Sequence, residues 1–160
     1  GPLVQVRGTI DAEGYLNIFR HRLRWYFPGL YNNEQIFQDD NARPHTADTV
    51  SKWFQKYGIE RMHWPSRSPD LNIIEDIWGK IKYEMRGKIF SSNDDLWEEV
   101  NHQWQQMSYR LIRQLYRSLS ARIEAVIEAQ GGVTKYLLNI CLYSKLYKTG
   151  EKKIYLDKLC

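Results

Sequence analysis

The sequence has few cysteines, no long apolar run and little excess charge. Its only two cysteines among 160 residues, Cys141 and Cys160, both lie near the end of the chain. They cannot staple the rest of the chain, so we expect a reducing compartment. No apolar stretch approaches the ~20 residues that span a bilayer, and the chain does not begin with a basic-then-apolar leader. The sequence therefore predicts an intracellular protein that is neither secreted nor embedded in a membrane.

The net charge of +4 is concentrated at one end of the chain. Residues 137–160 hold five lysines against Glu151 and Asp157, a net charge of +3, so residues 1–136 are close to neutral. Overall basicity is therefore a weak argument for nucleic-acid binding, and any such argument has to come from a site. The hydrophobic content of 42%, with six tryptophans, is enough for the core of one domain.

Strand-like and helix-like segments alternate along the first half of the chain. The strand candidates are residues 3–7, 36–40 and 59–64. Helical spacing covers the segments from Asp11 to Pro28 (with a buried stripe through Trp25), from Pro44 to Gly58, from Asn72 to Gly87, from Asn93 to Met107, and over residues 109–130. This order predicts an α/β layer backed by C-terminal helices, with too few strands for a complete sheet.

Two acids stand at positions typical of a metal site. Asp40 follows an apolar strand, and the carboxyl end of a strand is the usual location of a site in an open α/β sheet. Glu75 falls in the first turn of a later helix, with 34 residues between the two acids. Two carboxylates on rigid elements can hold Mg²⁺ or Mn²⁺, and a pair of such ions can activate a water for phosphodiester chemistry.

The same residues also have structural interpretations. Asn72 and Glu75 have the spacing of a capping box, in which each side chain binds a backbone N–H of the other. Asp40 can bond the backbone of its own turn, and His45 at a helix start can be structural. Arg43 can be a solvated surface charge. Spacing alone leaves these alternatives open.

The residue-by-residue sequence of two segments favours the metal-site interpretation. Residues 37–47, Phe-Gln-Asp-Asp-Asn-Ala-Arg-Pro-His-Thr-Ala, and residues 64–79, Trp-Pro-Ser-Arg-Ser-Pro-Asp-Leu-Asn-Ile-Ile-Glu-Asp-Ile-Trp-Gly, together closely resemble the catalytic domain of the Tc/mariner superfamily of DNA transposases. Residues 122–136 look like the C-terminal ending of that family. The resemblance covers about residues 1–136, a partial catalytic domain, whereas residues 137–160 resemble nothing in the family and form an unrelated basic tail.

The resemblance implies a ribonuclease H-like fold and an Asp-Asp-Glu metal triad that cuts and joins DNA with Mg²⁺ or Mn²⁺. Residue by residue, Asp40 matches the second Asp and Glu75 matches the Glu, so both are expected to be catalytic and to bind metal. Arg43, His45 and Lys80 are candidate DNA contacts. DNA is the implied partner, a homodimer is compatible with the family, and the implied location is the nucleus, with the cytoplasm as the alternative.

The first Asp of the triad has no counterpart in this sequence. Asp11 cannot replace it, because Asp11 matches a helix-start residue of the family. We therefore expect a transposase remnant that binds metal weakly and is inactive alone, with an unpaired sheet edge beside residues 36–40. The alternatives are a non-catalytic module that binds nucleic acid or protein, and a relic without a cellular role.

Overall fold

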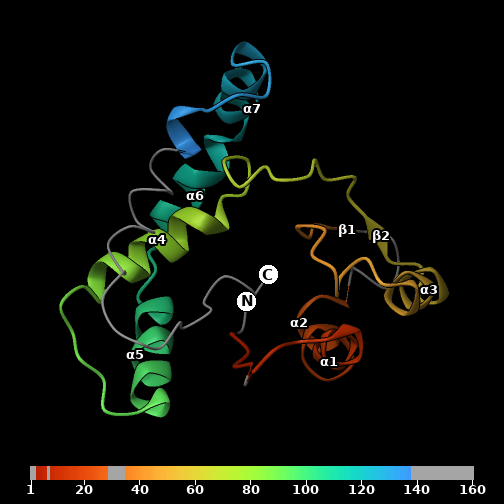
Figure 1. Cartoon of the computed structure of the whole chain (residues 1–160), viewed down its shortest axis with the longest axis horizontal. Helices are drawn as coiled ribbons and strands as arrows, with labels where there is room; N and C mark the ends of the chain where they lie inside the picture. Colours follow the sequence, from red (N-terminus) through yellow and green to blue (C-terminus); the bar gives the residue numbers. More distant parts are fainter. Residues whose placement is uncertain (1–2, 7, 29–34, 138–160) are drawn as a thin grey trace. The chain divides into compact units, whose positions relative to one another are not determined.

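The computed structural model describes residues 3–6, 8–28 and 35–137 of the chain (Figure 1). They form two compact units, the first extending to Arg67 and the second beginning at Ser68. The predicted tail, apart from Leu137, lies outside the described residues, and both cysteines lie there too. Among the described residues, no helix is long and apolar enough to cross a membrane.

The first unit holds a small parallel sheet with a helical crossover. Its elements are α1 (Ala12–Ile18), the π-helical turn η1 (Phe19–Leu23), α2 (Arg24–Tyr26), β1 (Ile36–Phe37), α3 (Asp48–Lys56) and β2 (Glu60–Arg61). Strands β1 and β2 pair in parallel, with Ile36 opposite Glu60 and Phe37 opposite Arg61. This parallel pair is compatible with the predicted α/β architecture with an incomplete sheet.

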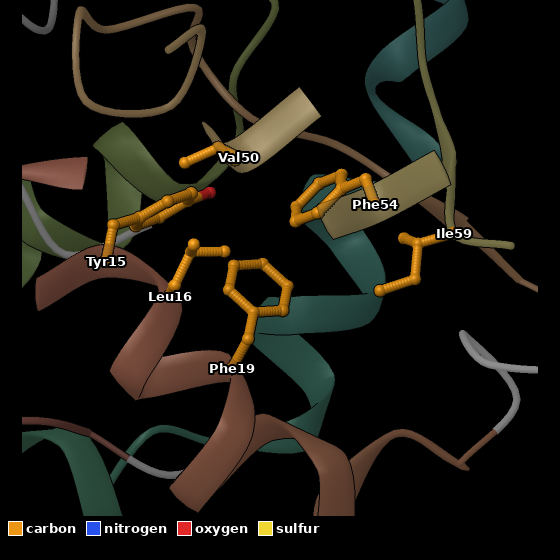
Figure 2. Close-up of a cluster of buried hydrophobic side chains, with 6 residues drawn as sticks. All are labelled: Tyr15, Leu16, Phe19, Val50, Phe54 and Ile59. Atoms are coloured by element: carbon orange, nitrogen blue, oxygen red, sulfur yellow. The ribbon is translucent and has the colours of Figure 1, made fainter. Parts of the chain in front are cut away.

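The core of the first unit lies between α1 and α3. Figure 2 shows side chains of α1 and η1 pointing toward those of α3, with six buried members: Tyr15, Leu16, Phe19, Val50, Phe54 and Ile59. Phe19 is fully buried, and its ring centroid lies 4.9 Å from those of Phe37 and of Phe54, both edge-on. The Asp11 carboxylate caps α1 by accepting a hydrogen bond from the Gly14 N–H at 2.8 Å.

Two sequence predictions for the first unit are wrong. Residues 3–6 form no strand, because alternation produces a strand only beside a pairing partner and no described strand pairs with them. Trp25 is 79% exposed rather than buried. Each residue of the π-helical turn η1 rotates the chain about the helix axis by a smaller angle than a residue of an α-helix does. Trp25 is therefore rotated away from the buried stripe that contains Phe19.

The segment between the two strands also differs from its predicted boundaries. The helix begins at Asp48 rather than near Pro44, because the Ala42 carbonyl first accepts the N–H groups of His45 and Thr46 in a tight turn. Strand β1 ends at Phe37 instead of residue 40. Asp39 and Asp40, which follow β1, lie outside the strand, and each accepts a hydrogen bond from a backbone N–H of the turn, as described below.

The second unit is helical. It contains α4 (Ile74–Glu84), α5 (Asn93–Gln105), α6 (Tyr109–Arg117) and α7 (Leu119–Glu128). Helix α4 packs against α5. Trp78 and Trp104 contribute to this contact, with ring centroids 5.6 Å apart. The predicted apolar face of α4 is confirmed, since Ile77, Trp78 and Ile81 are buried in the helix, as is its C-cap residue Met85.

The predicted helix over residues 109–130 is interrupted at Ser118. The Ser118 hydroxyl donates to the Leu115 carbonyl at 2.6 Å and accepts a hydrogen bond from Arg122 Nε at 2.9 Å. A serine that bonds back to the preceding turn bends a helix, and here it separates α6 from α7. Ile123 and Ile127, two of the apolar residues at helical spacing within 109–130, are exposed.

Candidate functional site

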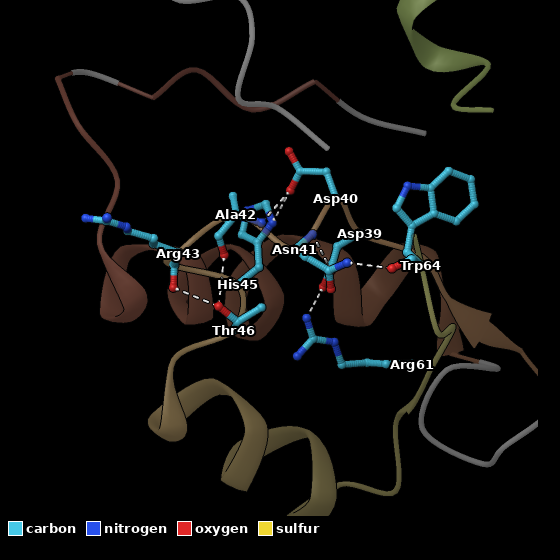
Figure 3. Close-up of polar contacts among 9 residues, drawn as sticks. All are labelled: Asp39, Asp40, Asn41, Ala42, Arg43, His45, Thr46, Arg61 and Trp64. Atoms are coloured by element: carbon cyan, nitrogen blue, oxygen red, sulfur yellow. Dashed lines mark hydrogen bonds and ion pairs between the residues drawn. The ribbon is translucent and has the colours of Figure 1, made fainter. Parts of the chain in front are cut away.

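The two neighbouring acids after β1 have different environments (Figure 3). The Asp39 side chain is buried, and its Oδ2 lies 2.6 Å from a guanidinium nitrogen of Arg61, in β2. Its other oxygen accepts the Asn41 N–H at 3.2 Å. Asp39 is therefore held as a structural acid between the strand ends, which leaves Asp40 as the one available to a ligand.

Asp40 is about half exposed, and its Oδ1 faces two groups of its own turn. That oxygen accepts the Ala42 N–H at 2.9 Å, as the turn-acid interpretation predicts, and lies 2.8 Å from His45 Nδ1. The ring N–H does not point straight at the oxygen, so this second contact is a close polar pair rather than a well-aligned hydrogen bond.

These neighbours keep Asp40 ionised. His45 has the largest influence and lowers the pKa of the Asp40 carboxyl below its ordinary value. Partial burial acts in the opposite direction, and the Ala42 N–H lowers the pKa further. An ionised carboxylate is the form that a divalent cation binds, so these contacts favour the form of Asp40 that a metal would need.

His45 connects this carboxylate to the core. It is only 4% exposed, and its ring is stacked on that of Tyr15 with centroids 4.1 Å apart. Arg43 is exposed and extends away from these contacts in Figure 3. Of the candidate DNA contacts in this unit, His45 therefore faces Asp40 and Arg43 faces solvent.

The residue directly after Asp40, Asn41, has a backbone conformation and a side-chain contact that suit asparagine. Its backbone has φ of 60°, a left-handed conformation that Asn adopts more readily than most residues. Its side-chain Nδ2 donates to the Trp64 carbonyl at 2.8 Å, beyond the end of β2. Asn41 thus turns the chain immediately after Asp40 and ties that turn to the neighbouring segment.

Replacing His45 by phenylalanine is expected to raise the pKa of Asp40 toward the ordinary Asp value. Phenylalanine can keep the stack on Tyr15 but removes Nδ1, the group that lowers the pKa most. Because that pKa is depressed in the folded protein, the stability from the ionised form is present at neutral pH. It is lost as the pH falls from the ordinary Asp pKa through the folded-state pKa. In the variant the two pKa values lie closer together, so this contribution is smaller at neutral pH and less of it is lost on acidification.

The measurement is a carbon-detected NMR titration of the Asp40 carboxyl. His63→Phe is the control, since His63 is exposed in the same unit. An Asp40 titration that is identical in the wild type and His45→Phe would contradict the role assigned to His45.

Glu75 and Lys80 belong to the second unit, on α4. Glu75 lies in the first turn and is partly buried. The Glu75 N–H donates to the Asn72 carbonyl at 3.1 Å, and the N-cap residue of α4 is Ile73, without a side-chain cap, so the first bond of the predicted capping box does not form. The Asn72 side chain accepts the Ile74 N–H instead, at 3.4 Å. Lys80 is exposed, with its ammonium group 2.7 Å from Glu84. Within the described parts of the chain, no three His, Cys, Asp or Glu side chains gather into a metal-binding cluster.

Comparison with known proteins identifies the family. Residues 7–97 match the family described as DDE superfamily endonuclease. The chain belongs to this family. The matched residues include Asp40 and Glu75 and fall in both units of the chain.

Curated relatives agree with this assignment. The Tc1 transposase of Caenorhabditis elegans is 34% identical over 136 residues, which are 85% of this chain and 50% of that protein. The Tcb1 transposase of Caenorhabditis briggsae is 32% identical over 136 residues, with the same two shares. The chain spans about half the length of these curated relatives. The predicted resemblance to Tc/mariner transposases is confirmed.

The chain also has a buried polar network that its sequence did not reveal. Arg122 of α7 is 2% exposed. Its guanidinium donates to the Asp70 carbonyl at 2.8 Å and to the Asp76 carboxylate at 2.9 Å. The Thr134 hydroxyl donates to the Asp70 carboxylate at 2.9 Å, and the Tyr136 ring lies 4.5 Å from the guanidinium.

This network gives a structural role to residues 122–136, the segment that resembles the C-terminal ending of the transposases. Asp70 and Asp76 flank Glu75 in the sequence, so Arg122 and Thr134 fix both sides of the segment that carries it. The sequence contains little signal for this arrangement. An arginine that is buried in a helix cannot be distinguished from a solvated one when its partners lie 46 and 52 residues away.

Proposed function

We propose that this chain is part of the catalytic domain of a cut-and-paste DNA transposase with a ribonuclease H-like core. Asp40 and Glu75 are two of its three metal-binding carboxylates. The observation that carries the proposal is the family match over residues 7–97, which contains both acids in the two segments that resemble the transposases. The parallel pair of strands joined by α3 is compatible with such a core.

The donors fit Mg²⁺ or Mn²⁺. Both are carboxylates, which are hard oxygen ligands, and Asp40 is half exposed with a lowered pKa. When bound, the ion would activate a water or hydroxyl for attack on a phosphodiester and would stabilise the leaving oxygen. In this chain His45, Ala42 and Asn41 orient Asp40, and the Arg122 network holds the segment of Glu75.

We propose further that the 160 residues alone do not cleave DNA. The family resemblance implies a third carboxylate, and Asp11, an acid early in the chain, is already used to cap α1. Two carboxylates would bind the metal weakly. DNA as the substrate implies a nuclear location. A non-catalytic nucleic-acid module is the alternative, and an exposed basic face on α6, described below, favours it.

Plasmid nicking tests the catalytic proposal. The chain alone, with Mg²⁺ or Mn²⁺, is expected to leave supercoiled plasmid as intact as metal alone does. A fusion that adds, ahead of residue 1, the part of the Tc1 transposase that this chain does not match is expected to nick the plasmid, because the family resemblance implies that the first Asp of the triad lies upstream of these residues. Asp40→Asn or Glu75→Gln should abolish that nicking, since either removes a metal ligand.

The matched control is Asp48→Asn, because Asp48 is an exposed acid of the same unit and should not affect nicking. Metal-dependent nicking by the chain alone that disappears in Asp40→Asn would refute the proposed inactivity. Nicking by the fusion that survives both substitutions would refute the assignment of the two acids.

A further inference from the structure

Helix α6 carries three arginines and no acid. Arg110, Arg113 and Arg117 stand at positions i, i+3 and i+7, which an α-helix places within an arc of about 60°. All three are exposed. The partly buried apolar residues of the same helix, Leu111, Ile112 and Leu115, lie on the opposite side, and α6 packs against α7. The arginine face is therefore directed away from the packed face of this helix (α6 is labelled in Figure 1).

The three guanidinium groups have no ion-pair partner within the part of the chain that the structure describes. Three other cations of the second unit do have one: Lys80 pairs with Glu84, Lys88 with Glu99, and Arg122 with Asp76. The one contact found for the three is that of Arg113, which lies 4.9 Å from the ring centroid of Tyr109. The arginine face is thus a concentrated charge for which the described residues supply no counter-charge.

This arrangement is unfavourable for the isolated helix. Like charges three and four residues apart on a helix repel each other, as Arg110 and Arg113 do, and Arg113 and Arg117. Arg110 also lies in the first turn, where the helix dipole disfavours a positive charge. A bound anion would remove both costs. Because the charges are spread over two turns, the complementary partner is a polyanion rather than a single small anion.

We propose that Arg110, Arg113 and Arg117 form a contact surface for the phosphate backbone of double-stranded DNA. The helix rise separates the first and last arginine by about 10 Å along the axis, which corresponds to about three phosphate steps of one strand. Tyr109 and Tyr116 are exposed on one side of the stripe and add hydroxyl donors beside it. The contact carries no base information and serves to position DNA.

This surface rests on the part of the proposed function that concerns DNA, but not on Asp40 or Glu75. It was not among the candidate DNA contacts of the sequence analysis, which were Arg43, His45 and Lys80. Sequence reasoning missed it because helical spacing over residues 109–130 drew attention to the apolar positions. That the arginine face lacks ion-pair partners can be recognised only when the residues that lie near it in space are known.

Binding of a short fluorescent duplex of mixed sequence, measured by anisotropy in EDTA, tests the proposal. The stripe variant combines Arg110→Gln, Arg113→Gln and Arg117→Gln. Glutamine is a good helix former, and circular dichroism would verify that the fold is kept. A control variant removes the same charge from three other exposed cations, through Lys52→Gln, Lys56→Gln and Arg86→Gln.

The result is read from the salt dependence between about 50 and 200 mM. Each phosphate contact contributes about 0.9 to the slope of log K against log salt, so the slope should be smaller by about 3 in the stripe variant. It should change little in the control. An equal decrease of this slope in the two variants would overturn the proposal. So would the absence of duplex binding by the wild type at low salt.

Failure here is distinguishable from failure of the catalytic proposal. The double variant Asp40→Asn and Glu75→Gln should bind the duplex in EDTA no more weakly than the wild type and with the same salt slope, because neither substitution removes a cation that contacts a phosphate. Loss of binding in that variant would overturn the independence of the α6 surface, whatever the nicking assay shows.

Discussion

Replacing Arg122 by methionine is expected to lower the free energy of unfolding of the second unit by about 3 kcal/mol. Methionine fills much of the same space but donates no hydrogen bond. The variant leaves the Asp70 carbonyl without its donor and the Asp76 carboxylate without its cation. Removing one member of a buried pair commonly costs 3–5 kcal/mol, and the lower end applies because the Asp76 side chain keeps 24% of its surface exposed.

Denaturant unfolding followed by circular dichroism would measure this loss, because the second unit is helical. Amide hydrogen exchange in α7 would locate it. Arg86→Met is the matched control, since Arg86 is exposed in the same unit and surface substitutions usually change stability by less than about 0.5 kcal/mol. A loss for Arg122→Met no larger than that of Arg86→Met would contradict the network.

Lysine at position 122 separates charge from geometry. It keeps the positive charge but lacks the planar fork that reaches the Asp70 carbonyl and the Asp76 carboxylate together. We expect Arg122→Lys to recover a minority of the stability lost in Arg122→Met. Full recovery would mean that charge alone, rather than the forked contact, holds the segment around Glu75.

The sequence was informative where the determinants are local. The position of Asp40 beyond an apolar strand, the start of α4 just before Glu75 and the buried face of α4 all follow from neighbouring residues. The cap of α1 is local too, since Asp11 and its partner Gly14 are three residues apart. These features depend on turn chemistry and periodicity, which a sequence displays directly.

It was uninformative where contacts join distant residues. Nothing in the chain indicates that Asp39 is bound by Arg61, 22 residues away, or that Thr134 reaches Asp70 across 64 residues. Interruptions of helices are similarly hidden. Ser118 divides the last predicted helix through a hydroxyl bond that also depends on Arg122, so the break is a product of tertiary packing.

The core of the first unit bears on the site as well as on stability. Phe19 is fully buried and has ring contacts with Tyr15, Phe37, Trp53 and Phe54, at centroid distances from 4.9 to 5.7 Å. Tyr15 in turn is stacked on His45, whose Nδ1 faces Asp40. A continuous series of contacts thus runs from the centre of the core to the candidate metal ligand.

Phe19→Ala is therefore expected to destabilise the first unit by about 4 kcal/mol, as buried Phe→Ala substitutions commonly do, because a cavity would remain among four rings. Trp25→Ala removes a larger side chain from the same helical segment, but Trp25 is exposed, so its effect should stay within about 0.5 kcal/mol. Denaturant unfolding followed by hydrogen exchange in α3 would compare them. Equal effects would mean that Phe19 is not the centre of this core. A loss confined to Phe19→Ala, together with a higher Asp40 pKa in that variant, would show that the core also holds His45 against the carboxylate.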